Sequence, residues 1–175
     1  MNRHWLFVPV VAVLAIALGF FATLWATPSV IMDRAWNRLS ERAGINHMAH
    51  TPQIDASRRE IVRPSPDLAY SVCAFDLRDG PLEIHVAPVP DHYWSLTIFD
   101  QDTNAVLVRS DRDTRGKPIN LVVAKRGQRA PSGMEQLDMP GNKGVALIRI
   151  LLKGRDDFAM VEKARAPSFC RPVKS

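Results

Sequence analysis

The chain has 175 residues, of which 46% are hydrophobic and 23% charged, and its formal net charge is +5 at pH 7. It is too short for two ordinary domains and too apolar for a disordered chain. The basic excess does not indicate nucleic-acid binding, because segments such as DRAWNRLSER and RSDRDTRGK mix both signs. We therefore expect one globular domain with an appendage and no nucleic-acid partner.

The appendage is an apolar segment near the N-terminus. Residues 5–26, WLFVPVVAVLAIALGFFATLWA, contain no charged side chain. As a helix, about 22 residues rising about 1.5 Å each cross the roughly 30 Å hydrocarbon core of a bilayer. The run exceeds the apolar region of a signal peptide, and Leu24 stands two residues before Ala26, where cleavage needs a small residue. We therefore favour an uncleaved membrane anchor over residues 1–27 to a cleaved signal.

The orientation of this anchor rests on two opposed signals. Arg34, Arg38 and Arg42 follow the apolar run and Arg3 precedes it, so the basic residues alone favour a cytoplasmic domain. A very short leading tail with one basic residue is typical of an export signal-anchor, and paired cysteines fit an oxidising compartment. We expect a single-pass protein in contact with inner-membrane lipid, with its C-terminal domain in the periplasm.

Residues 28–57 link the anchor to the domain. Pro28 predicts the end of the first helix, and SVIMDRAWNRLSERAG predicts a second one that stops at Gly44. This second helix is amphipathic, with one apolar face made of Ile31, Ala35, Trp36 and Leu39. It is expected to lie on the membrane surface or under the domain, and the polar sequence after it reads as a connector.

From residue 58 to 175 the hydrophobic pattern has a period of two. Short runs, AYSVCAFDL, PLEIHVA, YWSLTIFD, NAVLVRS, INLVVA and GVALIRILL, are separated by turn sequences such as RDG and MPGNKG. The later segment DDFAMVEKARA fits one short helix. The predicted fold is mainly β: an antiparallel β-sandwich with one short C-terminal helix, preceded by a transmembrane helix.

A longer segment, RPSPDLAYSVCAFDLRDGPLEIHVAPVPDHYWSLTIFDQDTN, resembles the DUF1254 family. That family has an RPNxDTLYS-like motif, a DLxxGP turn, a DxYWS-like strand and a DxxTN-like end. The similarity covers residues 58 to about 165, and it departs at Ser65, where the family has Asn, and at Leu68 and Ala69, where it has Thr-Leu. The resemblance implies a jelly-roll-like fold, the short membrane-anchored branch of the family, a DUF1214-like protein as companion, and no established activity.

Few residues form a known catalytic or metal-binding pattern. The chain contains no GxSxG elbow, P-loop or dinucleotide fingerprint. DQDTNAVLVRSD has partial calcium-loop spacing, but Ala105 replaces the required glycine, so a strand-turn-strand is expected. The pairs His47/His50 and His85/His92 have no third ligand beside them and read as surface or turn histidines. We expect neither a metal nor a cofactor.

The stretch RPSPD leads into the first long strand. Pro64 and Pro66 favour an extended entry, which places Asp67 at a turn where its carboxylate can accept backbone N–H groups. We favour an architectural corner in which Arg63 pairs with Asp67 or Asp100 and Tyr70 packs at the rim. The alternative is a wall of a binding pocket for an unidentified small molecule, made of Arg63, Asp67, Tyr70, Tyr93 and Trp94.

Three classes of function follow from these features. The favoured one is a non-catalytic binding or assembly module of the cell envelope. The second is a hydrolase or carbohydrate-active enzyme that uses Asp67 with Asp100 or His92, which for glycoside chemistry requires carboxyl groups about 5–10 Å apart. The third is a purely structural component of an envelope assembly.

The two cysteines, Cys73 and Cys170, are expected to form a disulfide. Cys73 lies in the first long strand, and Cys170 lies in the Pro-flanked segment PSFCRP after the short helix. We expect the bond to hold the C-terminal tail across the first strand, close to the RPSPD corner. The alternative is a buried free Cys73 with an unpaired Cys170.

Overall fold

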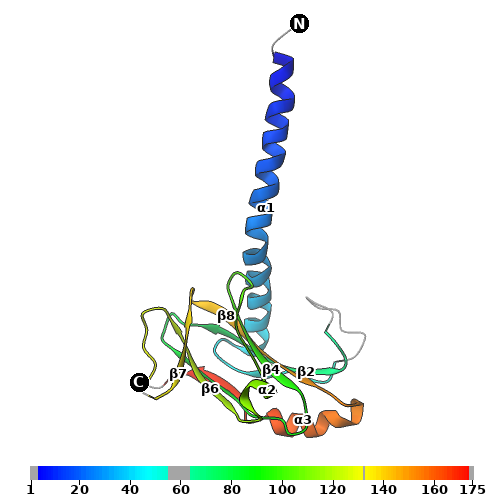
Figure 1. The fold of residues 1–175 in the computed structure, drawn as a ribbon, viewed down its shortest axis with the longest axis vertical. Coiled ribbons are helices and arrows are strands. Elements are labelled where there is room, and N and C mark those ends of the chain that lie inside the picture. Colours follow the sequence, from blue (N-terminus) through cyan, green and yellow to red (C-terminus); the bar gives the residue numbers. More distant parts are fainter. Residues whose placement is uncertain (1–3, 55–63, 132, 174–175) are drawn as a thin grey trace.

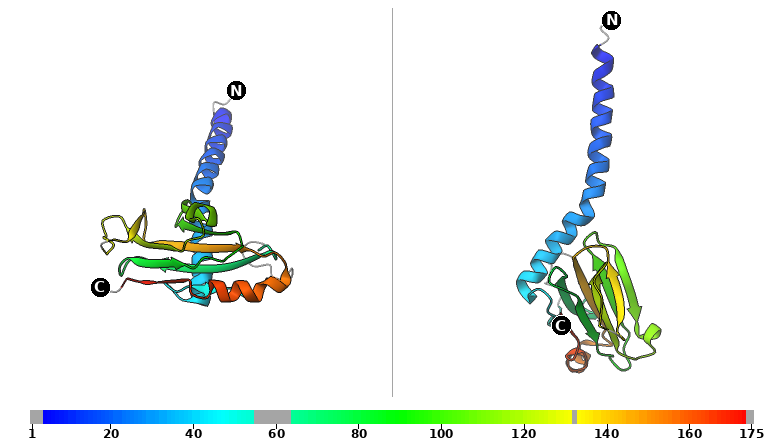
Figure 2. Two further views of the ribbon diagram at one scale, coloured as in Figure 1. Left: turned by 60° about the horizontal axis from the view of Figure 1, so that its bottom comes forward. Right: turned by 90° about the vertical axis from the view of Figure 1, so that its left-hand side faces the viewer.

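A two-layered β domain packs against the C-terminal part of a long helix, whose N-terminal part projects away from it (Figure 1). This computed structural model describes residues 4–54, 64–131 and 133–173. The first sheet has the strand order β1-β2-β8-β4-β5 and the second the order β7-β6-β3-β9. The two sheets face each other as the layers of a sandwich (Figure 2).

The elements have the following bounds. The first sheet contains β1 (Ala49–His50), β2 (Leu68–Asp76), β4 (Trp94–Asp100), β5 (Ala105–Ser110) and β8 (Lys143–Leu151). The second contains β3 (Leu82–Val86), β6 (Ile119–Lys125), β7 (Glu135–Met139) and β9 (Phe169–Pro172). The helices are α1 (His4–Ala43), α2 (Asp111–Thr114), the 3-10 turn η1 (Arg155–Asp157) and α3 (Phe158–Arg165).

The predicted mainly-β fold with a short C-terminal helix is confirmed. Each of the six predicted strands is present, within one or two residues of its expected position. Neighbouring strands are antiparallel throughout, except that β7 runs parallel to β6. The alternation works as expected in β8, where Ala146, Ile148 and Ile150 enter the core while Val145 and Leu147 face away from it.

The two sheets are joined by a disulfide along one edge of the sandwich and by an ion pair along the other. Cys73 of β2 and Cys170 of β9 form a disulfide with their Cα atoms 6.5 Å apart. Arg109 of β5 donates two hydrogen bonds to Glu135 of β7, one of them over 2.7 Å. Each link joins a strand of one sheet to a strand of the other, so both sides of the sandwich are held closed.

The predicted disulfide is therefore confirmed, but its expected setting is wrong. The C-terminal segment does not cross the first strand as a tail; it forms β9, in which Cys170 pairs with Ile84 of β3. Cys73 lies on the inner face of β2, so the bond spans the core between the sheets. The RPSPD corner is held by other contacts, described below.

The helix prediction needs a second correction at Pro28. This residue does not end the helix, because α1 continues through it to Ala43. Proline lacks an N–H and its ring crowds the carbonyl four residues earlier, so it bends a helix if the flanking turns are held. Figure 2 shows the change of direction between the N-terminal part of α1 and the part beside the sandwich.

Candidate functional site

Residues 64–67 of the RPSPD segment form a turn in which Tyr70 takes part. The backbone N–H of Ser65 donates to the Tyr70 hydroxyl over 3.0 Å, and the Ser65 hydroxyl accepts from Asp67 N–H over 3.4 Å. Leu152 N–H donates to the Asp67 carbonyl over 2.9 Å. The carboxylate of Asp67 is exposed, so the accepting role expected of it falls to Ser65. Arg63 lies outside the described residues.

The buried side chain of Arg165, which the sequence analysis did not single out, connects three segments near this turn. Arg165 of α3 is 1% exposed and donates to the carbonyls of Tyr70 and Thr51, each over 2.6 Å. Its charge is balanced by an ion pair with Glu162. One guanidinium, with its fork of donors, therefore ties α3 to β2 and to the segment after β1.

The aromatic residues proposed as pocket walls have different environments. Trp94 is 1% exposed and belongs to the core. Tyr93 is 44% exposed and lines a groove of about 470 Å³ between residues 88–94 and 111–116. Asp67 and Tyr93 do lie at the same end of the first sheet, because their carbonyls accept from the consecutive residues Leu152 and Leu151. Of the residues proposed as pocket walls, Asp67 and Tyr93 therefore lie at one end of the first sheet, whereas the Trp94 side chain points into the core.

The geometry contradicts the catalytic pair Asp67 and Asp100. Asp67 lies beside Leu152, whereas Asp100 pairs with Gly144, eight residues earlier on the same strand. At about 3.3 Å per residue, the two acids are about 26 Å apart along the sheet, far beyond the spacing that glycoside hydrolysis needs.

The second catalytic candidate, His92, is already fully bonded. One ring nitrogen lies 2.7 Å from the Pro90 carbonyl and the other 2.6 Å from the Asp157 carboxylate. The N–H of Lys153 and the ring of His92 lower the pKa of Asp157. With both nitrogens engaged and the ring buried, His92 fixes the loop before β4 to η1 and offers no free nitrogen to Asp67.

The acidic turn after β4 is the expected strand-turn-strand. Asp100 accepts from the N–H groups of Asp102 and Asn104, over 2.8 and 2.9 Å, and from the Asn104 amide over 2.9 Å. Its carboxylate therefore shapes the turn between β4 and β5. Within residues 4–54, 64–131 and 133–173, no group of three His, Cys, Asp or Glu side chains is placed to hold a metal ion.

Outside the main core, a joint forms between α1 and the outer face of the first sheet. A second apolar cluster combines buried side chains of the helix and the sheet: Met32, Trp36, Val72, Ala74 and Val145. Leu39, Phe99 and Leu147 pack around it. The apolar face predicted for this helix was partly right, since Trp36 and Leu39 lie under the domain while Ile31 is 52% exposed.

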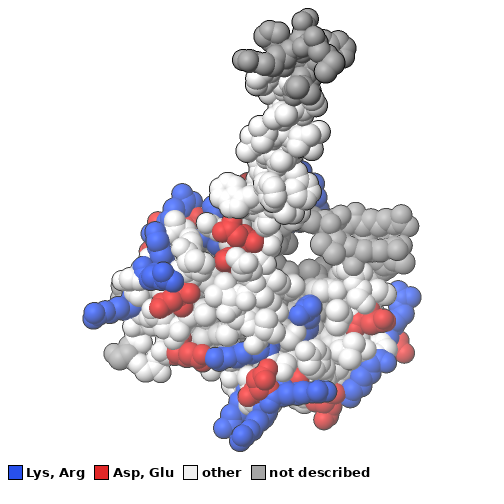
Figure 3. Space-filling model, turned by 45° about the horizontal axis from the view of Figure 1, so that its top comes forward, with Lys and Arg blue, Asp and Glu red and all other residues white. Residues whose placement is uncertain are grey.

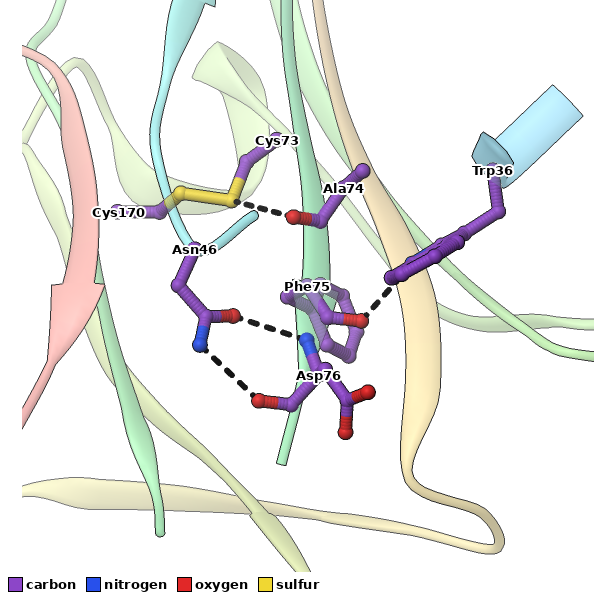
Figure 4. Close-up of a disulfide and its surroundings, with 7 residues drawn as sticks. All are labelled: Trp36, Asn46, Cys73, Ala74, Phe75, Asp76 and Cys170. Atoms are coloured by element: carbon purple, nitrogen blue, oxygen red, sulfur yellow. Dashed lines mark hydrogen bonds between the residues drawn. A yellow bond between two sulfur atoms is a disulfide. The ribbon is translucent and has the colours of Figure 1, made fainter. Parts of the chain in front are cut away.

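Polar contacts fix the direction in which the chain leaves this joint. The indole N–H of Trp36 donates to the Phe75 carbonyl over 3.0 Å (Figure 4). Just after the helix, the Asn46 side chain accepts from Asp76 N–H over 2.8 Å and donates to the Asp76 carbonyl over 3.1 Å. Asn46 thereby copies the hydrogen bonds of a strand backbone, and the C-terminal end of β2 is bonded both to Trp36 within α1 and to the segment that follows the helix.

At the start of β8, Gly144 lies opposite Phe75 on the core side of the sheet, directly beside the joint. A Cβ atom at Gly144 would lie 2.4 Å from the Phe75 ring and 2.5 Å from the Phe99 carbonyl, so β8 can pass there only as glycine. Beside it, Lys143 places its Nζ 4.1 Å from the centre of the Trp36 ring. The Lys143 ammonium therefore packs over the face of the Trp36 ring at the edge of the joint.

These features define a class: a small disulfide-bridged β-sandwich mounted on a long apolar helix by a packed joint. Residues 45–172 match the family described as "Protein of unknown function (DUF1254)", and the chain belongs to this family. The match starts directly after α1 and includes β1, so it begins earlier than the resemblance read from the sequence. No curated protein matches the chain.

Solved structures similar to this chain include the following two. The VPA0106 protein from Vibrio parahaemolyticus aligns with a TM-score of 0.62 and 17% identity, over 85% of this chain and 38% of that one. A putative uncharacterized protein from Burkholderia cenocepacia aligns with a TM-score of 0.47 and 15% identity, over 76% of this chain and 37% of that one. The Vibrio structure shows the same fold, and this chain spans about two-fifths of its length.

Proposed function

We propose that this chain is a membrane-anchored envelope protein whose sandwich faces the periplasm and acts as a non-catalytic binding or assembly module. The observation that carries the proposal is the exposed apolar part of α1. The helix contains an 18-residue window with a mean hydropathy of 2.5, none of which is buried against the rest of the chain. A contiguous exposed apolar surface of this length is typical of a segment that lies in a bilayer.

The continuity of α1 supports an anchor over a cleaved signal. The same helix that carries the apolar window ends in the joint, where Met32 and Trp36 are buried on the sheet. Residues around Ala26 are helical, so no extended segment is presented for cleavage there. In Figure 3 the apolar part of the helix that projects from the sandwich shows no charged side chain, while acidic and basic side chains are interspersed over the sandwich.

The disulfide supports a periplasmic domain. Bonds such as Cys73–Cys170 form and persist in oxidising compartments and are rare in the cytosol. We give this more weight than the basic residues that follow the apolar run, because a covalent link across the core is part of the fold. The resemblance to the family adds a DUF1214-like protein as the proposed companion, and inner-membrane lipid is the other contact.

Accessibility labelling tests the compartment. Asp156 is exposed on η1, far from the helix, so Asp156→Cys adds a thiol that leaves the native disulfide intact. A membrane-impermeant maleimide should label this thiol in intact cells after the outer membrane is permeabilised. Labelling only after lysis of the inner membrane would overturn the orientation, and extraction of the protein by alkaline carbonate would overturn the anchor.

Purification with its neighbours tests the binding role. The full chain, extracted in mild detergent, should retain a second protein at a fixed ratio, and we expect that protein to be DUF1214-like. A preparation that contains only this chain and no ligand would contradict the binding or assembly role while leaving the anchor untouched.

A further inference from the structure

The joint places one turn of the sandwich at the level of the lipid headgroups, if α1 is the anchor proposed above. Ser29 comes three residues after Ala26, the end of the apolar run, which is about 4.5 Å along a helix. The polar layer of a bilayer is about 5–8 Å deep on each side. The Ser29 hydroxyl donates to the Asp102 carboxylate over 2.6 Å. The turn between β4 and β5 therefore lies in this layer, beside the helix.

A groove of about 270 Å³ opens at the same level. One wall is the helix, with Ser29, Asp33 and Trp36, and the other is formed by Asp102 and Lys143 of the sandwich. The Lys143 ammonium lies 3.8 Å from the Asp33 carboxylate, whose side chain is 60% exposed. Lipid headgroups therefore have access to charged groups of both signs at one place.

The charges that line the groove favour one class of lipid headgroup. Asp33 and Asp102 contribute two negative charges and Lys143 one positive charge, so the groove has an excess of negative charge. We propose that it binds the headgroup of a phospholipid with a primary ammonium, of the phosphoethanolamine type. The phosphate pairs with Lys143, and the ammonium donates hydrogen bonds to Asp102.

The same charges disfavour the other common headgroups. A phosphoglycerol headgroup brings a negative charge and no cation, so Asp33 and Asp102 repel it. A choline headgroup is zwitterionic, but its quaternary nitrogen has no N–H to donate to a carboxylate. The proposal therefore predicts a preference by headgroup chemistry and not by net lipid charge alone.

Lipid retention measured by native mass spectrometry tests this site. The full chain is incorporated into nanodiscs that contain equal amounts of phosphatidylethanolamine, phosphatidylglycerol and phosphatidylcholine, and it is then released with its bound lipid. The wild type should retain phosphatidylethanolamine about threefold to fivefold over the other two, as expected of a partly exposed ion pair.

Three variants make the result specific. Asp102→Asn keeps an oxygen that accepts from Ser29 but loses the charge, so it should abolish the preference, and Lys143→Gln should weaken retention of phosphatidylethanolamine. Asp156→Asn makes the same charge change at the far end of the sandwich and should leave the preference intact. Thermal unfolding of each variant in the nanodisc shows that the fold is kept.

The outcomes separate this site from the anchor. If the protein enters nanodiscs but retains the three lipids equally, or if Asp102→Asn keeps the preference, the headgroup site is wrong and the anchor stands. If the protein does not enter nanodiscs at all, the anchor is wrong and the site falls with it.

Discussion

Replacing Trp36 with alanine tests whether α1 and the sandwich form one unit. Trp36 is 6% exposed, and its indole N–H is bonded to the Phe75 carbonyl. A buried Trp removes about 150–250 Å² from water, worth about 4–6 kcal/mol at about 25 cal/mol per Å². Because the neighbouring groove lets water replace part of the lost contact, we expect Trp36→Ala to lower the free energy of unfolding by about 3 kcal/mol, the low end for such truncations.

Urea unfolding of the full chain in detergent micelles measures this effect. The buried Trp94 remains as the fluorescence reporter in the variant. Amide hydrogen exchange adds a local readout, because residues 32–39 of the helix should exchange faster once the joint opens. Trp25→Ala is the matched control: Trp25 is 86% exposed, and its loss should change the free energy of unfolding by less than about 0.5 kcal/mol.

The reasoning is refuted if Trp36→Ala and Trp25→Ala have the same effect. Equal values would mean that the helix does not stabilise the sandwich and that the joint is an incidental contact. A loss confined to exchange at residues 32–39, with no change in the unfolding of the sandwich, would also contradict the single unit.

Three further predictions concern contacts that stabilise the sandwich. The double variant Cys73→Ala, Cys170→Ala opens a cross-link between residues 97 apart, so the free energy of unfolding in urea should fall by about 2–4 kcal/mol, and a loss below about 1 kcal/mol would contradict the stabilising role. Arg165→Met removes the guanidinium donor from the Thr51 and Tyr70 carbonyls, and among the described residues only the Tyr70 carbonyl keeps other donors, the N–H and hydroxyl of Thr51. The variant should therefore cost about 1–3 kcal/mol in the same assay; Arg165→Lys should cost less, and no loss in Arg165→Met would show that the guanidinium is not needed. Burial, and after it the charge of Arg165, lowers the pKa of His50 in the folded protein, so the unfolded chain binds a proton more readily and stability should fall as the pH drops below about 6.5. His50→Gln should reduce this slope between about pH 7 and pH 5 in thermal unfolding, and equal slopes would exclude His50 as the cause.

Local patterns in the sequence determined much of this protein. Alternation of apolar and polar residues located six strands, because successive side chains of a strand point to opposite faces. The length and apolarity of residues 5–26 predicted a helix there, and the even cysteine count predicted the disulfide. In each case the signal lies within a few neighbouring residues or in the composition, so no knowledge of the fold was needed.

Tertiary structure decided what depends on residues far apart in the chain. β7 and β9 have weak patterns of their own, since EQLDM and FCRP become strands only by pairing with β6 and β3. The Asp67 and Asp100 carboxylates looked like partners in sequence, but they stand at opposite ends of one sheet. The apolar outer face of β2 and β8 holds α1 in place past Pro28, because burying Met32 and Trp36 there outweighs the local preference of proline to end a helix.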